Sequence, residues 1–421
     1  ESRYIACGAD EGVRMTGAGT VGRVPFELGE EYVQDPHALY EALRADGAVR
    51  YVLPPSGLRA WLVPRYAEAR ALLADPRLRK GRDAIVAAFV RQYGPPTGDE
   101  DFPLTGHMLE TDPPDHTRLR KLVNRAFTAR RIEALRPRVR EIVAGYLDEL
   151  AASAPGESVD LIARYAFPIP VTVICELLGL PFADRADFRR WTAALLSVED
   201  DADAGREMAG YLTGLVDAKR AEPADDMLSA LIRAGDDEDR LSQHELVSTA
   251  FLLLVAGHET TVNLIGNGML ALLRHPDQLA ALRADPGLLP GAVEELLRYD
   301  GPINLATLRS TAESVEIDGV TIPAGEFVMI ALSGANRDPA RFAEPDRLDV
   351  RRPAGGHVAF GHGIHYCLCA PLARMEGALA VGGLLDRFPE LRLAGDASTR
   401  LRWRDSTLIR GLTELPVVPH A

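Results

Sequence analysis

The sequence has few cysteines, no excess of basic residues and no long apolar run. Four of the 421 residues are cysteine, scattered at 7, 175, 367 and 369, which does not indicate a disulfide framework. Lys and Arg number 47 against 61 Asp and Glu, and the net charge of −14 argues against general binding to nucleic acid. No apolar run approaches the ~20 residues of a membrane span, and the N-terminus has no signal pattern. We therefore expect a cytoplasmic protein without a membrane anchor.

Long linkers and internal repeats are also missing. Apolar residues make up 47% of the chain, which is enough to build a large buried core. No Gly/Ser-rich or Pro-rich linker interrupts the sequence, so we predict one domain over residues 25–421. Residues 1–24 are Gly-rich and polar, and they form an expected flexible N-terminus.

Hydrophobic spacing predicts a mainly α-helical fold with a minor β component. Helices are expected at residues 35–47, 65–74 and 116–125, and in succession through residues 132–231. Alternating apolar residues predict a hairpin of residues 49–53 and 58–63, and short strands at residues 315–317, 320–322 and 327–331. Residues 81–105 show no steady period. A stretch of that length without regular structure is often a lid over a binding site.

The stretch F-G-H-G-I-H-Y-C-L-C-A-P, residues 360–371, has the features of a binding loop. Gly361 and Gly363 lack a Cβ, so the backbone can turn tightly and lie close to a flat ligand. Cys367 opens a helix-rich run in which Pro371 fits the first turn, and the positive end of a helix favours thiolate over thiol. This arrangement suits a haem-thiolate centre. A lone cysteine before a helix is more often a buried small hydrophobe, and Cys-x-Cys also occurs in zinc sites, although no second Cys/His pair follows here.

Residues 241–275 predict one helix of about 33 residues, or roughly 50 Å, which is long enough to cross the whole domain. Ser242 and Glu245 form a capping box at its start, and the pair His275-Pro276 ends it. So long a helix is expected to place its middle at the centre of the molecule.

The middle of this helix reads A-G-H-E-T-T, residues 256–261, which weakens local helix preference and therefore indicates function. Thr260 can bond the carbonyl of Ala256 and open a groove beside Gly257 wide enough for dioxygen. Glu259 and Thr260 could then relay protons. The alternative is a helix kink that carries a surface glutamate.

Two further pairs of polar residues share a helix face. His116 and Arg120 are four residues apart and present two donors to an anionic group, although a solvated basic face is the usual explanation of such a run. Glu295 and Arg298, three residues apart in E-E-L-L-R-Y, can form a buried pair. Isolated pairs of this kind are usually surface salt bridges of little worth.

These stretches together resemble the cytochrome P450 superfamily over residues 25–417, with the motifs in the expected order. The similarity is closest to soluble actinobacterial members that tailor macrolides and other polyketides, through the runs H-M-L-E-T-D-P-P-D-H-T-R-L-R-K-L-V and L-V-A-G-H-E-T-T-V-N-L-I. One position departs from the family signature, because Cys369 stands where glycine is usual. We expect Cys367 to remain the ligand, since the glycines that set the loop precede it and Cys369 lies about 200° round the helix.

The resemblance implies a role for each matching residue. Cys367 is implied as the iron ligand, and Glu259 and Thr260 as the acid-alcohol pair that relays protons. The residues implied to surround haem b or hold its propionates are His116, Arg120, Ala256, Gly257, Arg309, Phe360, Gly361, His365 and Cys367. Glu295 and Arg298 are expected to form a structural triad with Arg337. The residues expected to flank the substrate are Ile303, Asn304, Leu305, Ala306 and Leu408.

The implied activity is a monooxygenase that hydroxylates or epoxidises a macrolide or another polyketide with O2. Electrons are expected from NAD(P)H through a ferredoxin or flavodoxin and its reductase, and a basic patch around Arg120 suits an acidic donor protein. We expect a monomer whose substrate is a lipophilic small molecule. Steroid-like, fatty-acid and carrier-bound substrates stay open. A peroxygenase that uses hydrogen peroxide directly and a haem sensor without turnover also stay open, although the acid-alcohol pair argues against both.

Overall fold

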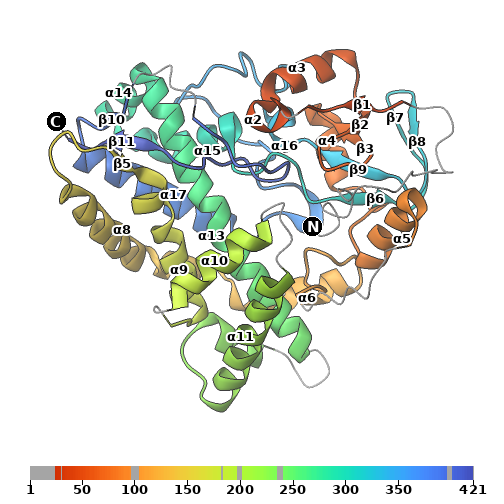
Figure 1. Cartoon of the computed structure of the whole chain (residues 1–421), viewed down its shortest axis with the longest axis horizontal. Coiled ribbons are helices and arrows are strands. Elements are labelled where there is room, and N and C mark those ends of the chain that lie inside the picture. The colour runs from red at the N-terminus through yellow and green to blue at the C-terminus, as the bar shows by residue number, and fades with distance from the viewer. Residues whose placement is uncertain are drawn as a thin grey trace.

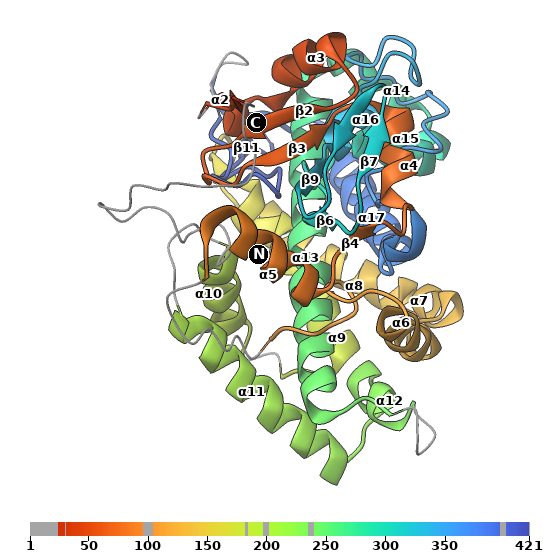
Figure 2. The same cartoon turned by 90° about the vertical axis from the view of Figure 1, so that its right-hand side faces the viewer.

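The computed structural model describes residues 24–29, 31–95, 104–181, 184–196, 202–234, 240–395 and 401–420. Helices account for 55% of the structure and strands for 10%, which confirms the predicted mainly α fold with a minor β component. Figures 1 and 2 show helices gathered around one long central helix, with the main sheet to one side. The predicted flexible N-terminus lies outside the described residues except for its last residue, Val24.

The helices follow the apolar spacing of the sequence at most of the expected positions. The first expected helix begins where the Asp35 side chain accepts a hydrogen bond from the backbone N–H of His37, and it ends before Gly47. The bounds are α2 (Glu31–Gln34), α3 (Pro36–Asp46), α4 (Tyr66–Leu73), α5 (Arg82–Tyr93), α6 (Asp115–Ala126), α7 (Ala129–Ala134), α8 (Arg136–Ala151), η1 (Ile162–Ala166), α9 (Pro168–Leu178), α10 (Arg185–Leu196), α11 (Ala202–Ala221), α12 (Met227–Arg233), α13 (Gln243–Arg274), α14 (Pro276–Ala284), η3 (Pro286–Leu288), α15 (Leu289–Asp300), α16 (Leu332–Asn336), η4 (Gly363–His365) and α17 (Ala370–Arg387).

The main sheet has the strand order β1-β2-β3-β9-β6-β4. Its strands are β1 (Phe26–Glu27), β2 (Arg50–Leu53), β3 (Ala60–Val63), β4 (Leu78–Arg79), β6 (Arg309–Thr311) and β9 (Phe327–Ile330). The predicted hairpin is confirmed, because β2 and β3 are antiparallel with Tyr51 opposite Trp61. Smaller sheets join β10 (Arg392–Leu393), β11 (Pro416–Val418) and β5 (Val159–Asp160), and the predicted pair β7 (Val315–Ile317) and β8 (Val320–Ile322).

One prediction about regular structure was wrong. Residues 81–105 were expected to lack it, but α5 occupies residues 82–93. Only Ala88 and Gln92 are buried on this helix, so no apolar stripe marks it in the sequence. Residues 96–103, which belong to the predicted lid, lie outside the described residues.

The predicted long helix is confirmed as α13, which spans 32 residues with both hydrogen bonds of the Ser242–Glu245 capping box present. It packs against α9, α11, α15 and α17, and it passes through the middle of the molecule in both views (Figures 1 and 2). Residues 256–261 are thereby placed at the centre, beside the segment that leads into α17. Among the described residues, no helix combines the length and the apolar character needed to span a membrane.

Candidate active site

The loop of residues 360–369 is closed by a backbone hydrogen bond from Cys367 N to Phe360 O, 2.9 Å long. Gly361 and Gly363 have φ angles of 72° and 76°, a region that favours glycine. A Cβ on Gly363 would lie 2.9 Å from the backbone of Leu73 and of its neighbour, so the loop packs directly on the end of α4. The two glycines therefore fix the path that carries Cys367, as the sequence predicted.

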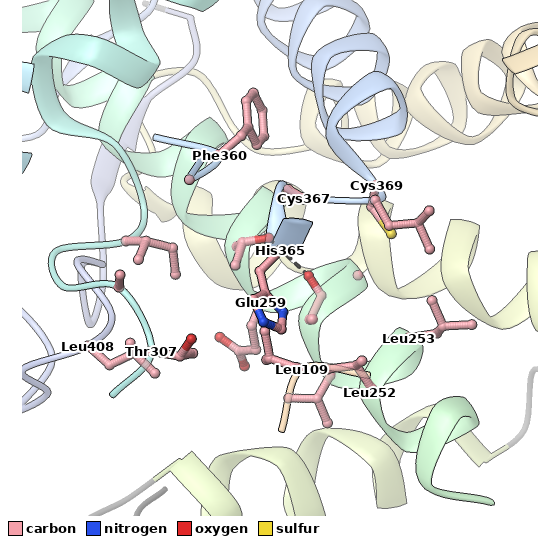
Figure 3. A pocket seen from close by; sticks show the side chains of 18 of the residues that line it. Leu109, Leu252, Leu253, Glu259, Thr307, Phe360, His365, Cys367, Cys369 and Leu408 are labelled. Carbon is pink, nitrogen blue, oxygen red and sulfur yellow. Dashed lines mark hydrogen bonds between the residues drawn. The ribbon is translucent and has the colours of Figure 1, made fainter. Parts of the chain in front are cut away.

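A cavity of about 420 Å³ lies between this loop and α13. Figure 3 shows side chains of Cys367, His365, Glu259 and Leu408 around it. Its walls are mainly apolar, with Leu109, Leu252 and Leu253 among them. The expected site residues that line it are Arg120, Ala256, Gly257, Glu259, Thr260, Ile303, Ala306, Arg309, Phe360, Gly361, His365, Cys367 and Leu408.

Two of the expected substrate-flanking residues do not line this cavity. Asn304 is 3% exposed and belongs to a buried polar network in which it accepts a hydrogen bond from Tyr40 and donates to Tyr32 and to the backbone of Thr407. Leu305 belongs to the apolar core beneath the sheet. The sequence prediction was wrong here because it treated four consecutive residues as one wall, whereas their side chains point in different directions.

The middle of α13 contains the predicted hydrogen bond. Thr260 Oγ1 donates to Ala256 O at 3.0 Å, and both residues face the cavity. The helix continues through this point without a break, so the expected opening beside Gly257 does not interrupt it. The space that a side chain at Gly257 would fill is occupied by Ile174 of α9, whose Cδ1 would lie 2.9 Å from a Cβ there.

Glu259 is buried, which contradicts the alternative of a surface glutamate. Its side chain is 5% exposed and accepts a hydrogen bond from Arg404 Nη1 at 2.8 Å. Sequence reasoning missed Arg404, since 145 residues separate the two partners and no local spacing links them. The ion pair is a contact that only the fold reveals.

A group of nitrogen donors gathers at one end of the cavity. The rings of His116 and His365 are 4.3 Å apart, Arg120 donates to Tyr366 O, and Arg309 donates to the carbonyls of residues 72 and 73. Lys80, which the sequence analysis missed, lines the cavity, whereas the expected His116 lies behind His365 and does not. His116 Nε2 and Arg309 Nε are buried and have no hydrogen-bond partner in the structure.

The pKa shifts in this group reflect burial beside like charges. Burial, with Lys80, His116, Arg309 and Arg120 nearby, lowers the pKa of His365 to about 2. Burial alone lowers the pKa of Arg309 to about 10, slightly opposed by Asp112. Buried cations and unpaired donors are costly unless an anion meets them. The donors thus fit the propionates of a haem group.

Cys367 and Cys369 both line the cavity (Figure 3). The expected angle of 200° between them does not apply, because α17 begins only at Ala370 and Cys369 is its N-cap residue. Burial raises the pKa of the Cys367 thiol, against backbone N–H groups of residues 369 and 370 and the charge of Arg120. Burial thus opposes the expected preference for thiolate. A bound metal ion deprotonates a thiol ligand, so the residue still fits an iron site.

The structural triad has a different third member from the one expected. Arg298 donates to both oxygens of Glu295, at 2.6 and 2.8 Å, and both side chains are fully buried. Arg352 Nε also donates to Glu295, at 3.1 Å. Arg337 instead donates to Tyr299 O and to Asp346. The prediction was wrong for Arg337 because its place in the motif order did not specify which way its side chain turns.

Comparison with known proteins agrees with this geometry. Residues 203–397 match the family model described as Cytochrome P450. The vitamin D(3) 25-hydroxylase of Pseudonocardia autotrophica is 52% identical over 388 residues, which cover 91% of this chain and 94% of that protein. The 6-deoxyerythronolide B hydroxylase of Saccharopolyspora erythraea is 47% identical over 371 residues, covering 86% and 90%. The solved structure of the tirandamycin C-bound P450 monooxygenase TamI is 50% identical with a TM-score of 0.87, and the match covers 94% of this chain and 100% of that one.

Proposed function

Because the chain belongs to the cytochrome P450 family and is a monooxygenase of secondary-metabolite biosynthesis, we propose that it hydroxylates or epoxidises a macrolide or another polyketide. The observation that carries the proposal is the placement of Cys367 and of the pair Glu259 and Thr260 around one apolar cavity. Residues 25–421 act in this proposal as a single haem-binding domain.

Haem b would be held at both ends of the cavity. Cys367 would bind its iron. The donors His116, Arg120, Arg309 and His365 would hydrogen-bond to its propionates, and the negative charge of the propionates would compensate the buried positive charge described above. When bound, the group supplies an iron that activates O2 for transfer of one oxygen atom to the substrate.

Glu259 and Thr260 have the proton-handling role in this mechanism. Thr260 uses its hydroxyl hydrogen on Ala256 O, so its oxygen keeps lone pairs that can accept a hydrogen bond from the cavity. Glu259 is buried beside the cavity but touches the partly exposed Arg404, so its carboxylate joins the interior to the solvent side. The apolar walls exclude bulk water, which confines proton transfer to these groups.

Electrons would come from NAD(P)H through a ferredoxin or flavodoxin and its reductase, and we propose that this exchange occurs in the cytoplasm with a monomeric enzyme. Arg120 donates to the carbonyl of Tyr366, next to Cys367. Lys121 and Arg125 are exposed on the same helix, and we propose that they add to the positive charge of α6. An acidic donor protein would be steered to that surface.

The cavity favours a lipophilic substrate because most of its wall is apolar. One relative is a 6-deoxyerythronolide B hydroxylase, and the TamI structure holds tirandamycin C, which supports the macrolide or polyketide proposal. The vitamin D(3) 25-hydroxylase, with comparable identity, supports a steroid-like substrate as the second candidate. Fatty-acid and carrier-bound substrates are weaker alternatives.

Optical titration of the purified ferric protein tests the substrate class. Macrolide and linear polyketide intermediates are added in parallel with steroid-like and fatty-acid compounds, and the low-spin to high-spin shift reports displacement of water. We expect a saturable shift with at least one macrolide. A spin shift seen only with steroid-like compounds would contradict the macrolide or polyketide proposal, but it would leave the assignment as a monooxygenase unchanged.

A second assay separates the monooxygenase from its rivals. The monooxygenase needs donor proteins and NAD(P)H to form product, whereas a peroxygenase forms it with hydrogen peroxide alone. A haem sensor forms none under either condition. Product that depends on the donor proteins is the expected result.

A further inference from the structure

Arg404 contacts the acid of the acid-alcohol pair directly. Its Nη1 donates to Glu259 Oε2 at 2.8 Å, and the arginine side chain is 30% exposed against 5% for the glutamate. His258 Nε2 lies 3.8 Å from the other oxygen, Oε1. Burial lowers the pKa of His258, which keeps its ring neutral. Among the described residues, Arg404 is therefore the charged group that pairs with this carboxylate.

The backbone of residues 403 and 404 is held by contacts with residues 411 and 412. Arg404 N donates to Gly411 O at 2.8 Å, and the preceding Trp403 pairs with Leu412 in a β-bridge. A side chain at Gly411 would collide with Asn263 of α13, so this turn packs directly on the central helix. Asn263 is four residues after Glu259 and lies on the same helix face. The arginine is thus delivered to Glu259 by a rigid support.

We propose that Arg404 is a positioning residue, which holds Glu259 as an ionised carboxylate with a fixed direction and releases it when it is protonated. This inference rests on the proposed function. Arginine keeps its own proton, so it cannot transfer one. When Glu259 takes a proton from water at its solvent side, the charge attraction ends and Arg404 can turn to solvent. Glu259 then passes that proton through water towards Thr260, becomes a carboxylate again and rebinds Arg404.

A purely structural salt bridge would have different consequences. If Arg404 only joined the turn to α13, its loss would lower stability but would leave proton transfer in the surviving enzyme unchanged. If it positions Glu259, its loss also slows proton delivery, and this effect disappears when residue 259 cannot ionise. The two explanations are therefore separated by combining both substitutions.

The variants are Arg404→Gln, Arg404→Lys and Glu259→Gln, the double variant of Arg404→Gln with Glu259→Gln, and the control Arg402→Gln. Arg402 is exposed and two residues away, and its side chain has no hydrogen bond or ion pair with any of the described residues. Denaturation midpoints are measured for all five proteins. Product per NAD(P)H, peroxide release and the solvent deuterium isotope effect are measured in the holoenzyme, and the ferric spin shift checks that substrate still binds.

We expect Arg404→Gln to lower the rate of product formation by roughly tenfold to a hundredfold, which is the order of effect of a misplaced catalytic group. Peroxide release and the solvent isotope effect should rise, Arg404→Lys should recover part of the loss, and Arg402→Gln should match wild type. The double variant should lose no more than Glu259→Gln alone, and the midpoint shifts of the single variants should not add.

Two results would overturn the inference. If Arg404→Gln keeps wild-type coupling and isotope effect, the ion pair has no part in proton delivery, even if the midpoint falls. Strictly additive losses in the double variant would mean that the two residues do not act together. A wild-type enzyme that forms no product would contradict the proposed function itself. Failure of the proposed function is therefore distinguishable from failure of the inference about Arg404.

Discussion

Loss of the buried carboxylate at Glu295 should destabilise the protein more than any surface ion pair. Its two oxygens accept two hydrogen bonds from Arg298, one from Arg352 and one from the backbone N–H of Asp349. Replacement by Gln keeps the shape but removes the charge and points N–H groups at arginine donors. The fully buried Arg298 and the partly buried Arg352 then lack a counter-charge.

The expected magnitude follows from burial. Removal of one partner from a buried ion pair costs about 3–5 kcal/mol, because the remaining charge stays desolvated. Arg352→Gln should cost less, about 1.5–3 kcal/mol for a hydrogen bond to a charged group, since Glu295 keeps Arg298. Arg337 contacts Tyr299 and the 61% exposed Asp346, and the structure records no contact between it and Glu295.

Urea denaturation of the haem-loaded protein measures the free energy of unfolding of each variant, and a double-mutant cycle then gives the coupling energy between two residues. Glu295→Gln with Arg352→Gln should show a coupling energy well above about 0.5 kcal/mol, whereas Glu295→Gln with Arg337→Gln should be additive within about 0.5 kcal/mol. Coupling to Arg337 and none to Arg352 would restore the triad expected from the sequence and refute the reasoning.

Three further outcomes test the site. Cys367→Ala should abolish the thiolate-type spectrum of the ferrous carbon monoxide complex while Cys369→Ala keeps it; the reverse result would move the iron ligand to Cys369. Thr260→Ala should lower product per NAD(P)H about tenfold or more and release peroxide, whereas unchanged coupling would remove its proton role. Burial raises the pKa of Glu376 well above 4.5, only partly opposed by Thr261, so the folded state keeps a proton that the unfolded state releases. Stability then falls as pH rises above about 4.5. Glu376→Gln should remove this loss in urea denaturation between about pH 5 and 8, and an unchanged pH dependence would contradict a buried neutral acid.

Local rules predicted the elements that hold the candidate site. The capping box at Ser242 and the Pro276 stop gave α13 almost to the residue, and the glycines at 361 and 363 gave the loop before Cys367. These features depend on contacts within a few residues along the chain. Helix α5 was missed because its few buried positions leave no apolar period.

Contacts between segments that are distant in the chain could not be predicted from the sequence. Motif order indicated Arg337 as the partner of Glu295, whereas in the folded chain it is Arg352 whose side chain reaches that carboxylate. Arg404 meets Glu259 across 145 positions, and Asn304 turns into a polar network away from the cavity. Each of these depends on tertiary packing, which neither periodicity nor spacing records.

The glycines of α13 show why a residue in a functional motif needs its packing examined. A Cβ at Gly257 would lie 2.9 Å from Ile174 of α9, and one at Gly268 would lie 3.0 Å from Leu296 of α15. Close helix packing thus requires a small residue at both positions, although only Gly257 borders the cavity. Glycine at 257 would be expected here even without an oxygen-binding groove. The case for chemistry in this segment therefore depends on Glu259 and Thr260, because burying an ionisable side chain beside an apolar cavity lowers stability unless it has a function there, and Thr260 lines the same cavity.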